Sequence, residues 1–538
     1  MKFRVAPVAA ASAAAFLLVS CGGESGKPTP PPGTPPVGQA PPPTLSTSLS
    51  QDAVEVVVEE GGSATFSFDA TYTGSSDDPV VADITVGAKR YRLAGSPSAS
   101  GKTFTVNLET VPFPAGGLAR SEVVFRLCKT SSCATVYPGS TQTFTVDLNV
   151  QLGDWAGFQR NAAHTGYVPV NYDVADFEKA WEWTDTDPSS WIRPPAATRG
   201  RILATVGRDG GMAYDQSAKL YSFDTSGNSD WSYNLGEQFD LSGPTLSNGM
   251  VHVTSMVSSS NSNPQWVFDL NTGGFLNQMK FASQWHAFNQ PTALGNQVFV
   301  AAGRYGEVLY AYDAARGTLQ WQMERIGGGW ADGKTVAVDA DYVYYPANVA
   351  LDIIDRRNGV IKQSIADPQT SVTDVSTFAS APVLGDDGLV FLFAGNKSFV
   401  SSAEIIAVST VQNRILWRSN AQYSTAFAVA GDTIYAVRND AHVLAALDAK
   451  TGVQKWAVPL PVDEGLYGEK SFHGNVVVTE NLVFASDHDT TWAVDLKAGN
   501  HPIVWEAPTG GRLIITPDNQ LLTTGVRENR KLTAYNLF

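Results

Sequence analysis

The stretch Leu444-Ala-Ala-Leu-Asp448-Ala-Lys-Thr-Gly452-Val-Gln-Lys-Trp456 decides the fold. It is an apolar strand ending at Asp448, a turn ending at Gly452, and a second strand that begins near Trp456. An Asp side chain can accept hydrogen bonds from turn backbone, and Gly readily adopts the left-handed conformation that such a turn requires. A Trp at the start of the next strand can bury a large apolar surface. The stretch therefore predicts a β-hairpin whose outer strand is fixed by its Trp.

This pattern recurs about every 45 residues, which is the period of a β-propeller blade. Two further copies are clear, and five are weaker or incomplete. Ser409 and Asn536 replace the Asp in two copies, and Asn277 and Gln363 fall where Trp is expected. The copies predict eight blades, with seven as the alternative if one irregular stretch is misassigned. The docking residues of the clear copies are Asp224, Gly227, Trp231, Asp313, Gly317, Trp321, Asp448, Gly452 and Trp456.

The last copy is cut off after Asn536, so its outer strand must come from elsewhere in the chain. The segment 177–184 contains Trp181 and Trp183 with the spacing of an outer strand, and no blade core precedes it. We expect this strand to complete the last blade, which closes the ring and removes an open sheet edge. The predicted propeller spans residues 153–538.

A different kind of domain precedes the propeller. All 13 Trp residues lie at or after Trp155, which marks a boundary near residue 152. Residues 47–152 hold short alternating runs separated by turn clusters, which predicts an antiparallel β-sandwich. Cys128 and Cys133 flank a polar turn, and an exported protein would oxidise them to a disulfide. Their spacing is not that of a C-x-x-C redox or metal motif. The segment 126–150 resembles bacterial immunoglobulin-like modules, which implies an N-terminal Ig-like sandwich before the propeller.

The first 20 residues are typical of an export signal. Lys2 and Arg4 are followed by an apolar Ala-rich run, which is too short for a membrane span. The run ends in Leu18-Val19-Ser20-Cys21, which resembles the lipobox of bacterial lipoproteins and implies that Cys21 carries the lipid. Residues 21–46 are rich in Pro and predict an extended tether. Gly22 after the Cys implies outer-membrane sorting, with the protein on the periplasmic face or the cell surface.

The A-x-D-x-x-x-G-x-x-x-W unit resembles the repeat of PQQ-like (quinoprotein-type) propellers. The segment Trp155–Gly166 also resembles the one that precedes their first blade. This family includes dehydrogenases that bind pyrroloquinoline quinone and calcium in the central channel. It also includes a non-catalytic scaffold lipoprotein of the outer-membrane β-barrel assembly machinery. The chain has neither adjacent cysteines nor a C-x-x-C-H haem motif, which favours the non-catalytic branch.

Segments that enter the innermost strand of each blade should line the mouth of the channel. They carry a mixed polar set that can hold an anionic ligand or simply solvate the channel. Within this polar set, the residues predicted to form a possible ligand site are Arg193, His286, Glu469, Lys470 and Arg512. No catalytic residue, metal ligand or cofactor is predicted outside the dehydrogenase alternative.

The net charge of −15 argues against nucleic acid as a partner, because a surface that binds phosphate groups must be positively charged. Gly328–Thr335 matches the literal phosphate-loop pattern, but strands rather than a helix are predicted after it, so no nucleotide is expected. The sequence predicts a lipid-anchored, non-catalytic envelope protein whose propeller binds other envelope proteins. Outer-membrane protein assembly is one role that such a scaffold could have. The alternatives are a PQQ-dependent dehydrogenase and a surface adhesin or glycan-binding protein.

Overall fold

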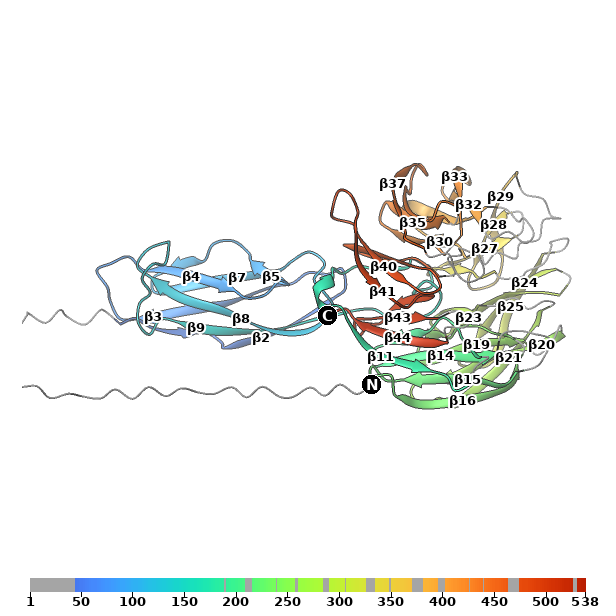
Figure 1. Ribbon diagram of the computed structural model, residues 1–538, viewed down its shortest axis with the longest axis horizontal. Coiled ribbons are helices and arrows are strands. Elements are labelled where there is room, and N and C mark those ends of the chain that lie inside the picture. The colour runs from blue at the N-terminus through green and yellow to red at the C-terminus, as the bar shows by residue number, and fades with distance from the viewer. Residues whose placement is uncertain are drawn as a thin grey trace, which may run out of the picture.

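The chain folds into two β-rich parts that lie side by side, an elongated sandwich and a ring of sheets (Figure 1). The structure is a computed structural model. It describes residues 44–187, 190–208, 215–238, 240–256, 260–283, 290–304, 306–325, 334–347, 350–369, 381–394, 402–424, 426–438, 440–462, 474–525 and 530–538. Its helices in these ranges are the short 3-10 turns η1 (Val174–Asp176) and η2 (Asp386–Gly388). In this part of the chain, no helix has the length and apolar character needed to cross a bilayer.

The sandwich consists of two sheets that share one apolar core. The first sheet has the order β1-β3-β7-β5 with β6 paired to β7, and the second has the order β2-β9-β8-β4. Phe68 of the first sheet stacks on Phe144 of the second with ring centroids 4.3 Å apart. In β9 every second residue from Phe144 to Val150 is buried, because alternate side chains of a strand point to opposite faces. The strands are β1 (Ser46–Leu49), β2 (Ala53–Glu59), β3 (Thr65–Thr73), β4 (Val81–Val86), β5 (Tyr91–Leu93), β6 (Ser98–Ser100), β7 (Thr103–Thr110), β8 (Gly117–Cys128) and β9 (Gln142–Gln151).

The predicted disulfide between Cys128 and Cys133 is confirmed, with a Cα–Cα distance of 5.0 Å. It closes the turn that leaves β8, and the backbone of Cys133 has a positive φ of 50°. Asp83 lies close to both sulfur atoms, but the disulfide leaves no thiolate to bind a metal. Asp83 instead accepts a hydrogen bond of 2.6 Å from the guanidinium of Arg126.

The ring consists of eight sheets among the described residues, each with a core of four antiparallel strands, and β10 adds to one of them as a parallel strand. Four of them lie in the first half of the ring. Their strands are β12 (Ser190–Ile192), β13 (Ala196–Thr198), β14 (Arg201–Arg208), β15 (Asp215–Phe223), β16 (Ser229–Gln238); β17 (Asp240–Leu241), β18 (Thr245–Ser247), β19 (Met250–Met256), β20 (Ser260–Asp269), β21 (Phe275–Ser283); β22 (Thr292–Leu294), β23 (Gln297–Ala302), β24 (Glu307–Asp313), β25 (Thr318–Arg325); β26 (Ala337–Val338), β27 (Tyr342–Ala347), β28 (Ala350–Asp355) and β29 (Ile361–Ala366).

The other four sheets complete the ring. Neighbouring innermost strands, such as β18 with β22 and β34 with β38, contact each other around the centre. The strands are β30 (Val383–Leu384), β31 (Leu389–Phe393), β32 (Ala403–Ser409), β33 (Arg414–Tyr423); β34 (Ala428–Ala430), β35 (Thr433–Arg438), β36 (Val443–Asp448), β37 (Gln454–Pro459); β10 (Tyr167–Val168), β38 (Val477–Thr479), β39 (Leu482–Ser486), β40 (Thr491–Asp495), β41 (Ile503–Ala507); β42 (Arg512–Ile515), β43 (Gln520–Thr524), β44 (Lys531–Asn536) and β11 (Glu178–Thr184).

Four of the recurring Trp residues, Trp181, Trp231, Trp321 and Trp417, lie against a turn glycine of the following sheet. The backbone of Gly452 has a φ of +71°, and a Cβ there would lie 2.5 Å from the ring of Trp417 in the preceding sheet. The Trp417 Nε1 donates a 3.0 Å hydrogen bond to the carbonyl of Ala449 in the same turn. Asp448 holds this turn by accepting hydrogen bonds from the backbone amides of Lys450 and Thr451. Gly and Trp therefore act as one unit, because only a residue without Cβ lets the ring approach.

Two positions without Trp keep the same hydrogen bond through an amide side chain. Asn277 Nδ2 donates to the carbonyl of Ala314 at 2.7 Å. Gln363 Nε2 donates to the carbonyl of Thr410 at 3.0 Å. The departures from the repeat therefore retain its polar contact and lose the buried aromatic ring.

The first outer strand of the ring pairs with the last strand of the chain. β11 is antiparallel to β44, with the register Glu178↔Asn536 through Thr184↔Lys531. Trp181 of β11 then packs on Gly227 of the next sheet, and its Nε1 donates a 2.8 Å hydrogen bond to the carbonyl of Thr225. The N-terminal strand thus joins the last sheet to the first.

The segment 155–166, which we call the hub segment, runs across the centre of the ring. Its backbone exchanges hydrogen bonds with residues in or beside the innermost strands β13, β18, β26, β30, β34 and β38, through partners such as Ala197, Leu246 and Val429. Gln159 extends this role by donating from Nε2 to the carbonyl of Phe427 at 2.7 Å. His164 is buried, and its Nδ1 lies 3.0 Å from the carbonyl oxygen of Pro382. One segment therefore ties six sheets together.

The sandwich is packed firmly on one face of the ring. The guanidinium of Arg90 donates to the carbonyls of Ala115 and Gly117 and lies 4.8 Å from the ring centroid of Phe538. A Cβ on Gly116 would lie 2.0 Å from the side chain of Asn519. Glu60 forms an ion pair with the buried Arg160 and accepts a 2.9 Å hydrogen bond from the amide of Gly153. These contacts join the two parts at several points around the last turn of the chain.

Candidate functional site

Two arginines of the predicted ligand site lie beside innermost strands of neighbouring sheets. Arg193 follows β12 in one sheet, and Arg512 is the first residue of β42 in the adjacent sheet. The amide of Arg193 donates a 2.9 Å hydrogen bond to the carbonyl of Thr205, which fixes its backbone. Its guanidinium lies 5.5 Å from the ring centroid of Trp191. Both residues were predicted as candidates for an anionic ligand.

The electrostatics of this pair favour an anion. Burial, together with the smaller effect of the positive charge of Arg193, lowers the pKa of Arg512 to about 10. Two positive groups that lie close together where water is scarce make it harder for each other to stay protonated. An anion between the two guanidinium groups would relieve that repulsion and accept several charge-assisted hydrogen bonds.

The hub segment supports the strand that carries Arg512. Asn475 Oδ1 accepts a 2.8 Å hydrogen bond from the amide of Leu513, and its Nδ2 donates to the carbonyl of the same residue at 3.0 Å. Nδ2 also donates to Gln159 Oε1 at 2.7 Å. Sequence reasoning identified neither Gln159 nor Asn475, because the two residues that bond to each other lie 316 positions apart along the chain.

The remaining predicted residues are distributed as follows. His286, Glu469 and Lys470 lie outside the described residues, as do Cys21 and most of the Gly328–Thr335 segment. Of that segment, Lys334 is buried and forms an ion pair with Glu307, and the strand β26 follows it. The Lys334 ammonium is therefore held by a carboxylate inside the fold. Asp224, Asp313 and Asp448 accept backbone hydrogen bonds in their turns.

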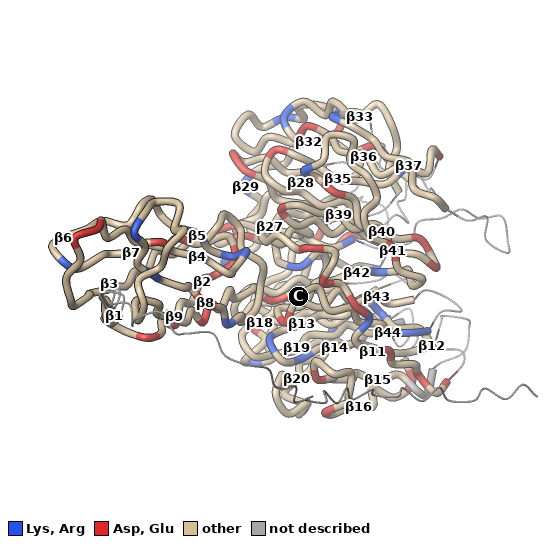
Figure 2. Tube along the Cα trace, turned by 60° about the vertical axis from the view of Figure 1, so that its left-hand side comes forward, with Lys and Arg blue, Asp and Glu red and all other residues tan. Residues whose placement is uncertain are grey.

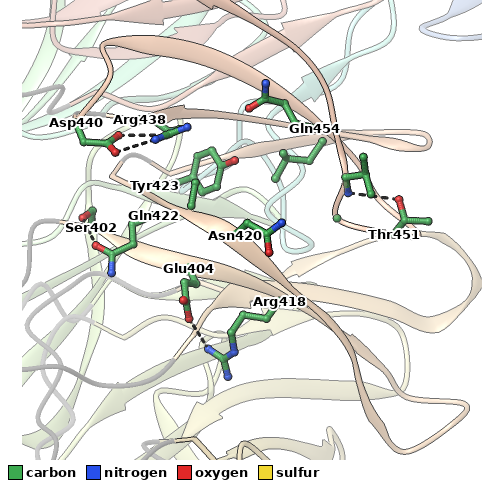
Figure 3. Close-up of a pocket in the computed structure, with 14 residues that line it drawn as sticks. Ser402, Glu404, Arg418, Asn420, Gln422, Tyr423, Arg438, Asp440, Thr451 and Gln454 are labelled. Atoms are coloured by element: carbon green, nitrogen blue, oxygen red, sulfur yellow. Dashed lines mark hydrogen bonds and ion pairs between the residues drawn. The ribbon is translucent and has the colours of Figure 1, made fainter.

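The structure also contains a groove that the sequence pattern did not indicate. It has a volume of about 610 Å³ and lies between the sheet of β30–β33 and the sheet of β34–β37. In Figure 3, Arg418 and Glu404 lie on one wall, Arg438 and Asp440 lie on the other, and Tyr423 lies between them. Arg418 Nη1 is 2.9 Å from Glu404 Oε2, and Arg438 Nη2 is 2.8 Å from Asp440 Oδ2.

The dehydrogenase alternative requires pyrroloquinoline quinone and calcium in the channel. Calcium is held by carboxylate and carbonyl oxygens. Of the five residues predicted as a possible ligand site, the structure describes Arg193 and Arg512, which are both cationic and would repel a dication. These two residues therefore do not fit calcium.

The fold defines an all-β protein with a β-propeller. Residues 241–458 match the family described as outer membrane protein assembly factor BamB. This part of the chain is a PQQ-like, BamB-type propeller domain, as the repeat predicted. No curated protein matches the chain.

Solved propellers resemble the chain at low sequence identity. The propeller of Dos1 has a TM-score of 0.47 and 11% identity, covering 68% of this chain and 96% of its own. AztD of Citrobacter koseri has a TM-score of 0.40 and 11% identity, covering 62% of this chain and 96% of its own. The Pan2 WD40 domain of Neurospora crassa has a TM-score of 0.37 and 9% identity, covering 68% and 96%.

Proposed function

We propose that this protein is a lipid-anchored, non-catalytic scaffold of the outer membrane that acts in outer-membrane protein assembly. The observation that carries the proposal is the match of residues 241–458 to the assembly-factor family. Cys21 at the end of an export signal supplies the anchor, and residues 21–46 form the tether. The propeller is the binding platform for other envelope proteins.

The proposal includes a finer description of both parts. The eight sheets of the ring are eight blades, with β11 supplying the outer strand of the last one. The sandwich is Ig-like, because its orders β1-β3-β7-β5 and β9-β8-β4 correspond to the A-B-E-D and G-F-C sheets of immunoglobulin domains. β2 is then an added strand, parallel to β9.

The two ends of the sandwich give the scaffold a direction. Thr44 and Leu45 lie against Gly74 and Gly139 at one end, and Gly116 contacts the propeller at the other. The tether therefore enters at the end remote from the propeller, so that the sandwich is a spacer between membrane and propeller. β42 begins at Arg512 and runs toward the turn that contains Asn519, which contacts Gly116 of the sandwich. Arg512 therefore lies at the end of this strand that is remote from the sandwich, and we place the channel mouth on that side.

Crosslinking in intact cells, followed by detergent extraction and pull-down of the acylated protein, tests this proposal. We expect the pore subunit of the barrel-assembly machinery among the crosslinked partners. A Cys21→Ala variant is the control, because it should lose membrane attachment and most of the crosslinks. Recovery of no assembly component, or reduction of a dye after addition of pyrroloquinoline quinone and calcium, would contradict the proposal.

A further inference from the structure

The groove between the sheets of β30–β33 and β34–β37 originates in an irregular outer strand. On β32, Glu404 and Ile406 are two residues apart, but their partners on β33 are Gln422 and Arg418. The segment Ser419–Ala421 therefore forms a bulge two residues longer than regular pairing allows. Ser419 Oγ holds it by accepting from the amide of Ile405 and donating to the carbonyl of Ala421. Such bulges redirect side chains and are frequent near functional sites.

The charged groups in this groove are already paired with one another. Arg418 binds Glu404 and also donates to both carboxylate oxygens of Asp367 at 2.7 Å. Arg438 and Asp440 form a bidentate pair with distances of 3.1 and 2.8 Å. A charged ligand would have to displace one of these partners. The outer lone pairs of the carboxylates remain able to accept hydrogen bonds from hydroxyl groups.

Exposed amide side chains supply further donors and acceptors. Asn420 and Gln422 come from the bulged strand, and Gln454 comes from the neighbouring sheet. Figure 3 places Gln454 and Asn420 on opposite walls. An amide can donate and accept at the same time, which suits a hydroxyl that does the same.

The groove offers little to an extended peptide. Its apolar lining is limited to Ala421, Leu447, Val453 and the buried ring of Tyr423, and the side chain of Val453 is largely exposed. Peptide grooves depend on apolar pockets for alternate side chains. The volume of about 610 Å³ is within the usual range of small-ligand sites.

We infer that this groove is a binding site for a neutral, hydroxyl-rich oligosaccharide. Balanced charges, planar amides and a mostly polar lining suit a ligand with many hydroxyl groups and no net charge. The inference goes beyond the scaffold role, because it rests on the lining of this groove and not on a partner protein.

Isothermal titration calorimetry of the full-length protein with chitohexaose and maltohexaose tests the inference. Chitohexaose represents N-acetylated cell-wall glycans, and maltohexaose represents simple hexose polymers. We expect binding of at least one of the two. The double variant Asn420→Ala with Gln454→Ala should weaken it about tenfold, since two hydrogen bonds are lost. Both side chains are exposed, so the variant should fold normally.

The matched control is Gln322→Ala, which removes an exposed amide from the outer strand β25 and should leave binding unchanged. The inference would be overturned if neither chitohexaose nor maltohexaose binds. It would also be overturned by sugar binding that the double variant does not change, or by an uncharged unstructured peptide that binds the wild type and not the double variant.

Discussion

At the scale of single residues, the glycines of the repeat act through the ring that covers them. Gly227, Gly273, Gly359 and Gly452 all have positive φ, and an added Cβ at each would meet a Trp of the preceding sheet within 2.7 Å. The stability of each interface therefore depends on two conditions at one position, backbone conformation and lack of a side chain.

The first prediction separates these two conditions. Gly452→Ala should lower the free energy of unfolding by about 2 to 4 kcal/mol, because it adds overpacking against Trp417 to left-handed strain. Gly249→Ala is the control, since its φ is +74° and a Cβ there meets nothing within 4 Å. It should cost only about 1 to 2 kcal/mol. Equal losses in urea denaturation would contradict the packing argument.

The second prediction concerns His252, which is fully buried in β19. Burial lowers its pKa from 6.5 to about 4, and neither ring nitrogen has a hydrogen-bond partner among the described residues. As the pH falls below 6.5, the unfolded chain binds the proton first, so stability is lost between pH 6.5 and 4.

His252→Leu should reduce this pH dependence by up to about 1.4 kcal/mol per pH unit. Urea denaturation at several pH values from 8 to 4 measures it. Above pH 7 the slopes of the variant and the wild type should agree, because the histidine is neutral in both states there. Parallel curves over the whole range would show that His252 does not contribute.

At the scale of elements, the closing strand β11 connects the last sheet to the first. Trp181→Ala should destabilise the propeller by about 3 kcal/mol, because the ring leaves Gly227 and the hydrogen bond to Thr225 is lost. Hydrogen exchange should also become faster in β44, its partner strand. Glu178→Ala, an exposed position in the same strand, is the control. Unchanged exchange in β44 would contradict the closing role.

The sequence predicted the elements that carry a repeated or local signal and missed the groove and the contacts of Gln159, which carry neither. The Asp-Gly-Trp pattern predicted a propeller because each unit has the same local physics, and an all-β fold with a PQQ-like propeller segment is confirmed. The disulfide was predictable because its partners are close in sequence. The groove depends on a bulge at Ser419–Ala421, and the role of Gln159 depends on distant backbone groups. Neither leaves a periodic signal.

At the scale of the whole molecule, the sandwich and the propeller are joined through tightly packed glycines. Gly116→Leu should push the two parts apart, because a Cβ there already overlaps Asn519. Small-angle X-ray scattering should then give a larger radius of gyration and a broader distribution of interatomic distances. Proteases should also cleave the variant faster near residue 152. Gly499→Leu is the control, since nothing lies within 4 Å of its added Cβ. Identical scattering curves would contradict a rigid junction.

The parallel pairing of β2 with β9 has a mechanical consequence. The tether leads into β1, the chain then enters β2 at Ala53, and β9 leads directly into the propeller from its last residue. A pull between a membrane anchor and a partner bound to the propeller would act on the two strands in opposite directions along their length. Their register, from Ala53↔Thr145 to Glu59↔Gln151, would then be loaded in shear, with its hydrogen bonds sharing the force rather than opening one at a time. Rupture under load is governed by the unfolding rate. The sandwich would thus serve as a force-bearing link as well as a spacer.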